Sequence, residues 1–154
     1  MSEDNLHVNE SNNSENSYHI NIRPHFTHRF IYKNKEFDIN LFLLSSCSDY
    51  FESNFNKFKN SETICFEGNE DDLDMSDYIQ TFFDICHFSD IKLTDENVLP
   101  LHYICCIFNA KSIKEKIQQY INENHSRLAI RILQFNQQNR KCKLEIKMIS
   151  NNKF

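Results

Sequence analysis

Histidine and cysteine side chains are the first candidates for chemistry in this sequence, because they bind metal ions and act as nucleophiles or bases. His25 and His28 are three residues apart, and His19 is close by. Residues three apart on an extended strand point to opposite faces, so these two histidines are not expected to meet at one ion. No cysteine stands beside them at the spacing of a zinc site. The sequence therefore predicts no metal site.

A cysteine close to a histidine suggests a nucleophile with its base, and two such groupings occur. Cys86 precedes His87, and His102 is followed by the pair Cys105 and Cys106. The latter pair lies in an apolar run that predicts the middle of a helix, where buried thiols are inert. The main prediction is therefore a protein that is not an enzyme, and a metal-binding or catalytic Cys/His site is the alternative.

The composition excludes several classes of site and partner. With Gly68 as its single glycine, the chain cannot form the glycine-rich turns of dinucleotide, phosphate or hydrolase sites, so no cofactor is expected. The formal net charge of −5 argues against nucleic acid as a partner. No apolar run reaches the roughly 18 residues of a membrane-spanning helix, so no membrane contact is expected. The acidic start and six cysteines without a C-x-x-C pair predict no secretory signal and reduced thiols, hence a cytoplasmic or nuclear protein.

The elements that position these residues begin with short strands. Residues 1–22 are rich in Asn and Ser and predict a disordered tail, although residues 18–22 alternate like an edge strand. Residues 26–32 and 36–39 predict a hairpin with a turn at Asn34. Two further short strands are expected at 63–66 and 91–93.

The spacing of apolar residues predicts helices in the rest of the chain. Residues 40–58 predict two short helices with a break at the serines of 45–48, and Asp74 or Ser76 is the expected cap of the next helix. Pro100 falls in the first turn of a long helix, where its missing amide proton costs least. Two of the helices after the acidic loop at 67–74 are expected to have their apolar faces at 79–86 and 113–121, and the other two helices are expected at 94–110 and 128–135.

Together these elements predict an α+β domain, with a small mixed β-sheet flanked by a cluster of α-helices. The domain is expected at 23–122, between the tail at 1–22 and a segment at 123–154 that holds one more helix and a basic end. The predicted core consists of apolar residues that recur along these elements: Phe30, Phe37, Leu44, Phe51, Phe55, Ile79, Phe82 or Phe83, Leu99, Tyr103, Ile107 and Ile117.

Two segments of the sequence resemble signatures of the BTB/POZ domain family. Glu36–Phe51 resembles a pattern in which an apolar strand end and a helix precede Ser-x-Tyr-Phe, here beginning at Ser48. Ile79–Leu99 resembles the other signature, in which a helix runs into a Tyr-Thr-Gly turn, a strand and a helix opened by Glu-Asn-Val. The resemblance to the family extends from about Phe26 to Ile121. The resemblance therefore implies a BTB/POZ-like fold for most of the chain.

The sequence departs from the family pattern at several places, among them the Asp-Val that often opens the first strand, which is absent near Phe26-Thr27. Asn40-Leu41 stands where many members have His-Lys, and His87-Phe88-Ser89 replaces Tyr-Thr-Gly. No apolar-periodic helix precedes Phe26, whereas the long form of the family uses such a helix and its strand to build a swapped homodimer. A homodimer and a shorter, monomeric form therefore both stay open.

The resemblance implies a module that acts by protein–protein contact. Many family members pair with themselves or dock a cullin scaffold, which makes them substrate adaptors for ubiquitin ligases. The cullin surface then lies on the helix corresponding to residues 76–85 and on nearby loops, where an apolar-x-acidic motif occurs. The candidate partner-binding residues are Asp49, Glu52, Phe82, Phe83 and Asp84.

These candidates and this function each have an alternative explanation. Phe82 and Phe83 lie on a helix that must bury one face, so core packing accounts for them as well. Asp49 and Glu52 are equally typical of a solvated helix face. The same fold occurs in small adaptor subunits that link a cullin to F-box or SOCS-type proteins, which is the alternative function. The Ser-x-Tyr-Phe segment favours the BTB branch over those adaptors.

Overall fold

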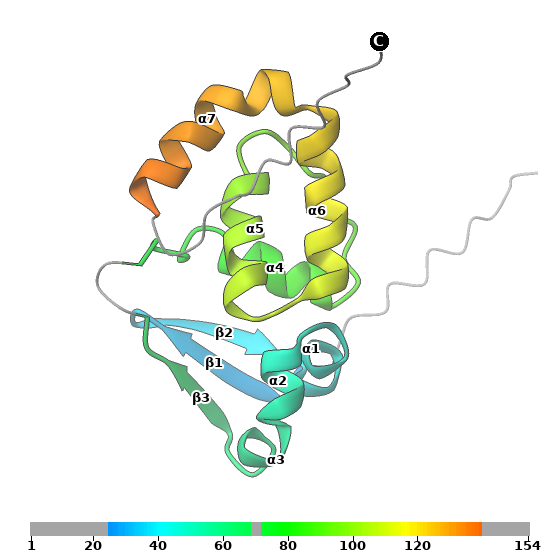
Figure 1. The fold of residues 1–154 in the computed structure, drawn as a ribbon. Coiled ribbons are helices and arrows are strands. Elements are labelled where there is room, and N and C mark those ends of the chain that lie inside the picture. The colour runs from blue at the N-terminus through cyan, green and yellow to red at the C-terminus, as the bar shows by residue number, and fades with distance from the viewer. Residues whose placement is uncertain (1–24, 69–71, 140–154) are drawn as a thin grey trace, which may run out of the picture.

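The structure is a computed structural model that describes residues 25–68 and 72–139. The predicted tail at 1–22, its edge strand at 18–22 and the basic end at 140–154 lie outside the described residues. The elements, shown in Figure 1, follow in the order β1 (His28–Tyr32), β2 (Lys35–Ile39), α1 (Leu41–Cys47), α2 (Asp49–Ser53), α3 (Phe55–Phe58), β3 (Thr63–Phe66), α4 (Ile79–Cys86), α5 (Val98–Ile107), α6 (Lys111–Glu123) and α7 (His125–Gln138).

The predicted hairpin and mixed sheet are confirmed. β1 and β2 pair antiparallel along their whole lengths, and the two residues that join them, Lys33 and Asn34, have positive φ values of 46° and 61°. Two such residues give the turn whose twist matches that of the flanking strands. β3 pairs parallel with β1 on its other side, so the strand order is β2-β1-β3.

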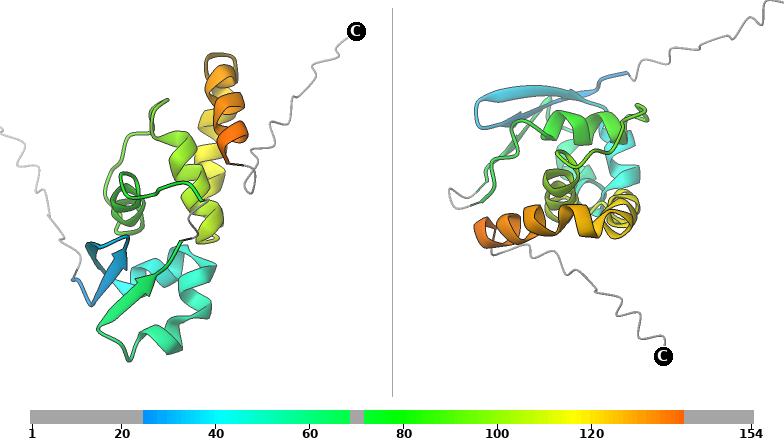
Figure 2. Two further views of the ribbon diagram at one scale, coloured as in Figure 1. Left: turned by 90° about the vertical axis from the view of Figure 1, so that its left-hand side faces the viewer. Right: turned by 90° about the horizontal axis from the view of Figure 1, so that it is seen from above.

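One face of the sheet is covered by helices, as Figures 1 and 2 show. Alternate residues of β1 and β2 point to that face and are buried, because successive side chains of a strand point to opposite faces. These inward residues are Phe30, Tyr32, Phe37 and Ile39. The sheet therefore provides one wall of the hydrophobic core.

The helical segment at 40–58 contains three short helices, α1 to α3, instead of the two predicted. The expected break at the serines lies at Ser48, whose backbone is extended. Its hydroxyl accepts a hydrogen bond from the Phe51 N–H and donates one to the carbonyl of Phe108. Because both bonds hold Ser48 outside a helix, α1 ends and α2 begins at this residue.

Both α4 and α5 begin later than the sequence predicted. Asp74 accepts hydrogen bonds from Ser76 in a turn ahead of α4, and α4 itself begins at Ile79 without a side-chain cap. The expected strand at 91–93 is wrong: this segment is not a strand and pairs with none of the described strands, and Asn97 donates to the carbonyl of Lys92. Side chains thus satisfy backbone groups that the prediction had assigned to a sheet or a helix.

The predicted core residues are buried with two exceptions, Phe55 and Ile107, which are partly buried. Phe55 lies near the surface, where its ring packs against Phe42 at 5.1 Å between centroids. The centre of the core is aromatic. The ring of Phe30 lies 5.1 Å from Phe83 and 6.0 Å from Phe108, a residue the sequence analysis had not selected.

α7 is the helix farthest from the sheet in Figure 1, and it is longer than the predicted 128–135. It buries Leu128, Ile132 and Phe135 and leaves Leu133 exposed. Arg127 of α7 pairs with Asp95 ahead of α5, and this pairing lowers the pKa of Asp95 to about 2. Within the described ranges, the helices are too short or too polar to cross a membrane.

Candidate docking surface

Phe82 and Phe83 are not exposed, which corrects their prediction as an aromatic anchor on the surface. Both side chains have 0% exposure. α4 packs against both the sheet and α5, so neighbouring positions on this helix face protein on two sides. The ring of Phe83 packs against Phe37 of the sheet, and that of Phe82 packs against Phe108 at 5.5 Å between centroids. Both residues therefore belong to the core.

The three acidic candidates lie in different surroundings. Asp49 accepts a hydrogen bond from Nδ2 of Asn109 at 2.9 Å, and its carboxylate lies 3.2 Å from Nζ of Lys111. These contacts tie α2 to the turn between α5 and α6, which gives Asp49 a structural role. Glu52 is exposed on α2, and Asp84 is partly exposed on α4. Glu52 and Asp84 stay predictions as partner-binding residues.

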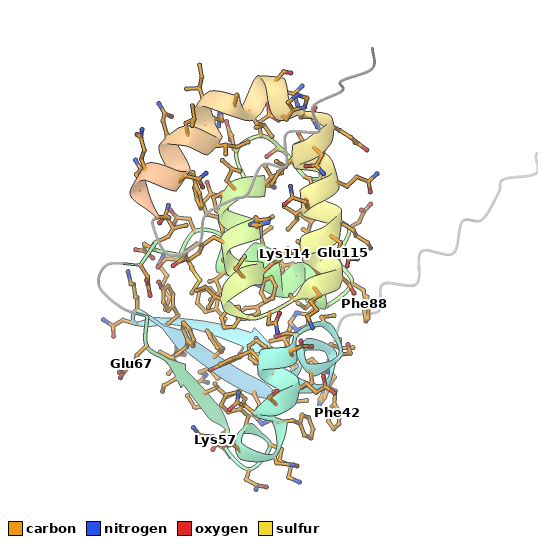
Figure 3. The ribbon with its side chains drawn as sticks, viewed as in Figure 1. Phe42, Lys57, Glu67, Phe88, Lys114 and Glu115 are labelled. Atoms are coloured by element: carbon orange, nitrogen blue, oxygen red, sulfur yellow. The ribbon has the colours of Figure 1, made fainter. Side chains whose placement is uncertain are left out.

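Exposed aromatic side chains that the sequence analysis did not select form a more prominent surface feature. Phe88, two residues after the end of α4, is 74% exposed, and Phe42 in the first turn of α1 is 68% exposed. Figure 3 shows both at the same edge of the molecule. Phe26, ahead of β1, is also exposed. We call this region the α1–α4 surface and define it by Phe26, Phe42, Asp84 and Phe88.

Hydrogen bonds between the start of α1 and the end of α4 hold the α1–α4 surface in place. Asn40 caps α1, because its side-chain oxygen accepts from the N–H of Leu43. The N–H of Asn40 donates to Nε2 of His87, the last cap residue of α4, at 3.0 Å. The ring of Phe26 packs edge-on against His87 at 5.6 Å. Burial lowers the pKa of His87, with Asp84 opposing in part, so a neutral ring accepts the bond.

Phe88 has a backbone conformation that is unusual for a bulky residue. Its φ is +63°, in the left-handed region that glycine or asparagine usually occupies just after a helix. The N–H of Ser89 donates to the carbonyl of Asp84 at 2.9 Å, and that of Phe88 donates to Ile85 at 3.0 Å. These two bonds form a Schellman motif. This backbone conformation costs about 1–2 kcal/mol of free energy for a residue with a Cβ atom.

Among the cysteines and histidines that the sequence groups, the structure brings Cys106 and His102 together within α5. Burial raises the pKa of Cys105 to about 12, which opposes formation of the nucleophilic thiolate. Cys106 lies 3.8 Å from Nδ1 of His102 within the same helix. Nδ1 of His28 bonds the hydroxyl of its neighbour Thr27. Among residues 25–68 and 72–139, no three His, Cys, Asp or Glu side chains are grouped to hold a metal ion.

Comparison with known proteins identifies relatives of this fold. The family model described as the BTB/POZ domain matches residues 25–125, which include both segments that carried the resemblance in the sequence. Among solved structures, the chain is similar to the BTB (Tramtrack and Bric a brac) domain of human gigaxonin. The identity is 15%, the match covers 61% of this chain and 75% of that chain, and the TM-score is 0.46. No curated protein matches the chain. The predicted family resemblance and α+β class are thus confirmed.

Proposed function

Since the chain belongs to the BTB/POZ domain family, whose members are generally protein–protein interaction modules and not typically enzymes, we propose that it docks a protein partner on the α1–α4 surface. The partner contacts Phe42 and Phe88 with an apolar groove and places a cation or hydrogen-bond donor against Asp84. Such an arrangement, with aromatic residues at the centre and a carboxylate at the rim, is typical of protein interfaces.

The backbone and exposure of Phe88 together carry this proposal. A glycine at this position would relieve the cost of the positive φ and would remove an exposed apolar ring from water. Neither property of Phe88 therefore serves folding. A strained residue that presents a large aromatic side chain to solvent is expected at a functional surface, because binding then buries the ring.

A cullin scaffold is the proposed partner of this surface. The resemblance implies a cullin contact at the helix corresponding to residues 76–85 through an apolar residue beside an acidic one. Phe82 and Phe83 are buried, but Phe88 and Asp84 provide the same chemistry at the end of α4. Phe88 thus takes the role that the sequence analysis gave to Phe82 or Phe83.

Capture on immobilised N-terminal cullin fragments tests this proposal. Phe88→Asn removes the ring but tolerates the positive φ, so we expect folded protein with about 30-fold weaker capture, as for an interface residue worth about 2 kcal/mol. Leu133→Asn is the matched control, because Leu133 is 60% exposed on α7, away from α1 and α4. Equal capture of wild type and Phe88→Asn would remove the α1–α4 surface from the proposal.

Two alternatives predict other outcomes. A self-associating module would give a species heavier than the 18.5 kDa chain in sedimentation at micromolar concentration, and Phe42→Ser would return it to the monomer. A small adaptor subunit would capture F-box or SOCS-type proteins together with the cullin.

We also propose 23–122 as the extent of the module, followed by the segment at 123–154, and cytoplasm or nucleus as its compartment.

A further inference from the structure

We propose that Cys47 and Cys86 form a reactive dithiol, which a peroxide oxidises to a disulfide that ties α1 to α4. Cys47 is the last residue of α1, and Cys86 is the last residue of α4. The thiol of Cys47 donates to the carbonyl oxygen of Cys86 at 4.0 Å, so the two residues are in contact. Both are free thiols. A disulfide therefore needs Sγ of Cys47 to turn from this carbonyl oxygen to the sulfur atom of the same residue.

The two thiols are prepared for different roles. The hydrogen bond from Cys86 lowers the pKa of Cys47 to about 6, although burial opposes this, and the hydroxyl of Ser46, 3.6 Å away, adds to the lowering. The same bond, followed by burial, raises the pKa of Cys86. Cys47 is partly exposed, whereas Cys86 is buried. Cys47 is therefore the thiolate that meets the oxidant. Cys86 keeps its proton beside this thiolate and becomes the resolving nucleophile once Cys47 is a sulfenic acid, because the charge on Cys47 that helps to raise the pKa of Cys86 is then gone.

The reaction has two balanced steps. The thiolate of Cys47 attacks one oxygen of the peroxide, the O–O bond breaks, and the departing hydroxide takes a proton to become water, which leaves a sulfenic acid on Cys47. The sulfur of Cys86 then attacks the sulfenic sulfur, the S–O bond breaks, and the departing hydroxide takes the proton of Cys86 to form a second water. Two thiols lose two electrons in total, and one peroxide is reduced to two waters.

Two other described cysteines, Cys65 and Cys105, lack this arrangement. Cys65 is exposed on β3, and no resolving thiol contacts it among the interactions of residues 25–68 and 72–139. Cys105 is buried and holds its proton, because burial raises its pKa to about 12. Oxidation is therefore expected to favour the Cys47–Cys86 pair over Cys65 and Cys105. The proposal does not depend on the docking function, because it concerns thiol chemistry within the fold.

Peptide mass spectrometry of the full chain after brief treatment with hydrogen peroxide at neutral pH tests this proposal. We expect a linked peptide that joins Cys47 to Cys86, and dithiothreitol should return it to the two thiols. Cys47→Ser should lose the linked peptide, and Cys65→Ser should retain it. A sulfenic acid probe should label Cys47 in Cys86→Ala, which lacks the resolving thiol.

Two results would overturn the proposal. The first is oxidation of Cys65 in folded wild-type protein while Cys47 and Cys86 stay reduced. The second is conversion of Cys47 to a sulfinic acid without a linked peptide, since this would show that Cys86 cannot reach it. Both results come from the wild-type chain, so they do not depend on whether the Cys86 variant folds.

Discussion

The C-terminal ends of α4 and α5 have the same backbone geometry and opposite side-chain choices. Each ends in a Schellman motif, with the residue after the cap at positive φ: Phe88 at 63° after α4 and Asn109 at 49° after α5. In α5 the two bonds run from the N–H of Ala110 to the carbonyl of Cys105 and from the N–H of Asn109 to that of Cys106. The two ends therefore allow a direct comparison of one structural position.

Asn109 is suited to the folded structure, whereas Phe88 is suited to binding another molecule. Asparagine tolerates the left-handed region, and Asn109 also donates from its side chain to Asp49 and accepts from the Asp49 N–H on its carbonyl. Every feature of Asn109 thus serves the fold. Phe88 has an unfavourable backbone conformation and an exposed ring, so its identity points to contact with another molecule.

The largest expected effect is at the buried side of the α5 end. Phe108, the cap residue of α5, is fully buried, and its ring packs against those of Phe51 and Phe82 at 5.3 Å and 5.5 Å between centroids. Phe108→Ala should lower the free energy of unfolding by about 3–5 kcal/mol, because it leaves a cavity among rings from several elements. Urea denaturation followed by far-UV circular dichroism measures this loss. A loss below about 1 kcal/mol would show that the aromatic cluster repacks.

A smaller effect is expected one residue further along the chain. Asn109→Ala forces a Cβ residue without side-chain hydrogen bonding into the left-handed region and removes the bond to Asp49. We expect a loss of about 1–2 kcal/mol in the free energy of unfolding. Asn109→Gly is the matched control, because it keeps the backbone freedom and loses only the bond. If both variants lost the same stability, the backbone conformation would not be the cause.

The sequence predicts the elements whose signals are local. Aromatic and β-branched residues ahead of a turn at Asn34 predicted the hairpin, and the residues at 36–51 and 79–99 predicted the family. The strand expected at 91–93 was wrong because Asn97, several residues away, bonds the backbone that a strand partner would have bonded. The burial of both Phe82 and Phe83 follows from the packing of α4 against both the sheet and α5, which a helical periodicity does not reveal.

The candidate surface was only partly predictable. The sequence showed that His87-Phe88-Ser89 departs from the Tyr-Thr-Gly turn of the family, and Asp84 was selected four residues earlier. That departure was the available signal for Phe88, but its exposure and its positive φ became visible only in the structure. The contacts of Asp49 with Asn109 and Lys111 join distant parts of the chain, so its structural role was not visible either.

A substitution at the end of α4 is expected to raise the stability of the fold, whereas those at the end of α5 lower it. Phe88→Gly relieves the strain of the left-handed backbone conformation, which asparagine tolerates at the equivalent position after α5. The free energy of unfolding should therefore rise by about 0.5–1 kcal/mol. The same variant should lose capture by the partner, because the ring is gone. Thermal and urea denaturation measure the first effect. A drop in stability would mean that the ring of Phe88 packs on the fold and is not free for a partner.

The smallest expected effect is a pH dependence of stability at the end of α4. His87 accepts a hydrogen bond from Asn40, and burial lowers its pKa below the ordinary 6.5, with Asp84 opposing in part. As the pH falls, the imidazole of His87 is therefore protonated in the unfolded chain before it is protonated in the folded chain. Stability from His87 should be complete above pH 6.5, decline as the pH falls below that value, and be fully lost below the folded pKa. His87→Gln keeps an acceptor for Asn40 but does not titrate, so urea midpoints of wild type and variant should converge or cross as the pH is lowered. Parallel curves would show that His87 is not the titrating group that links α1 to α4.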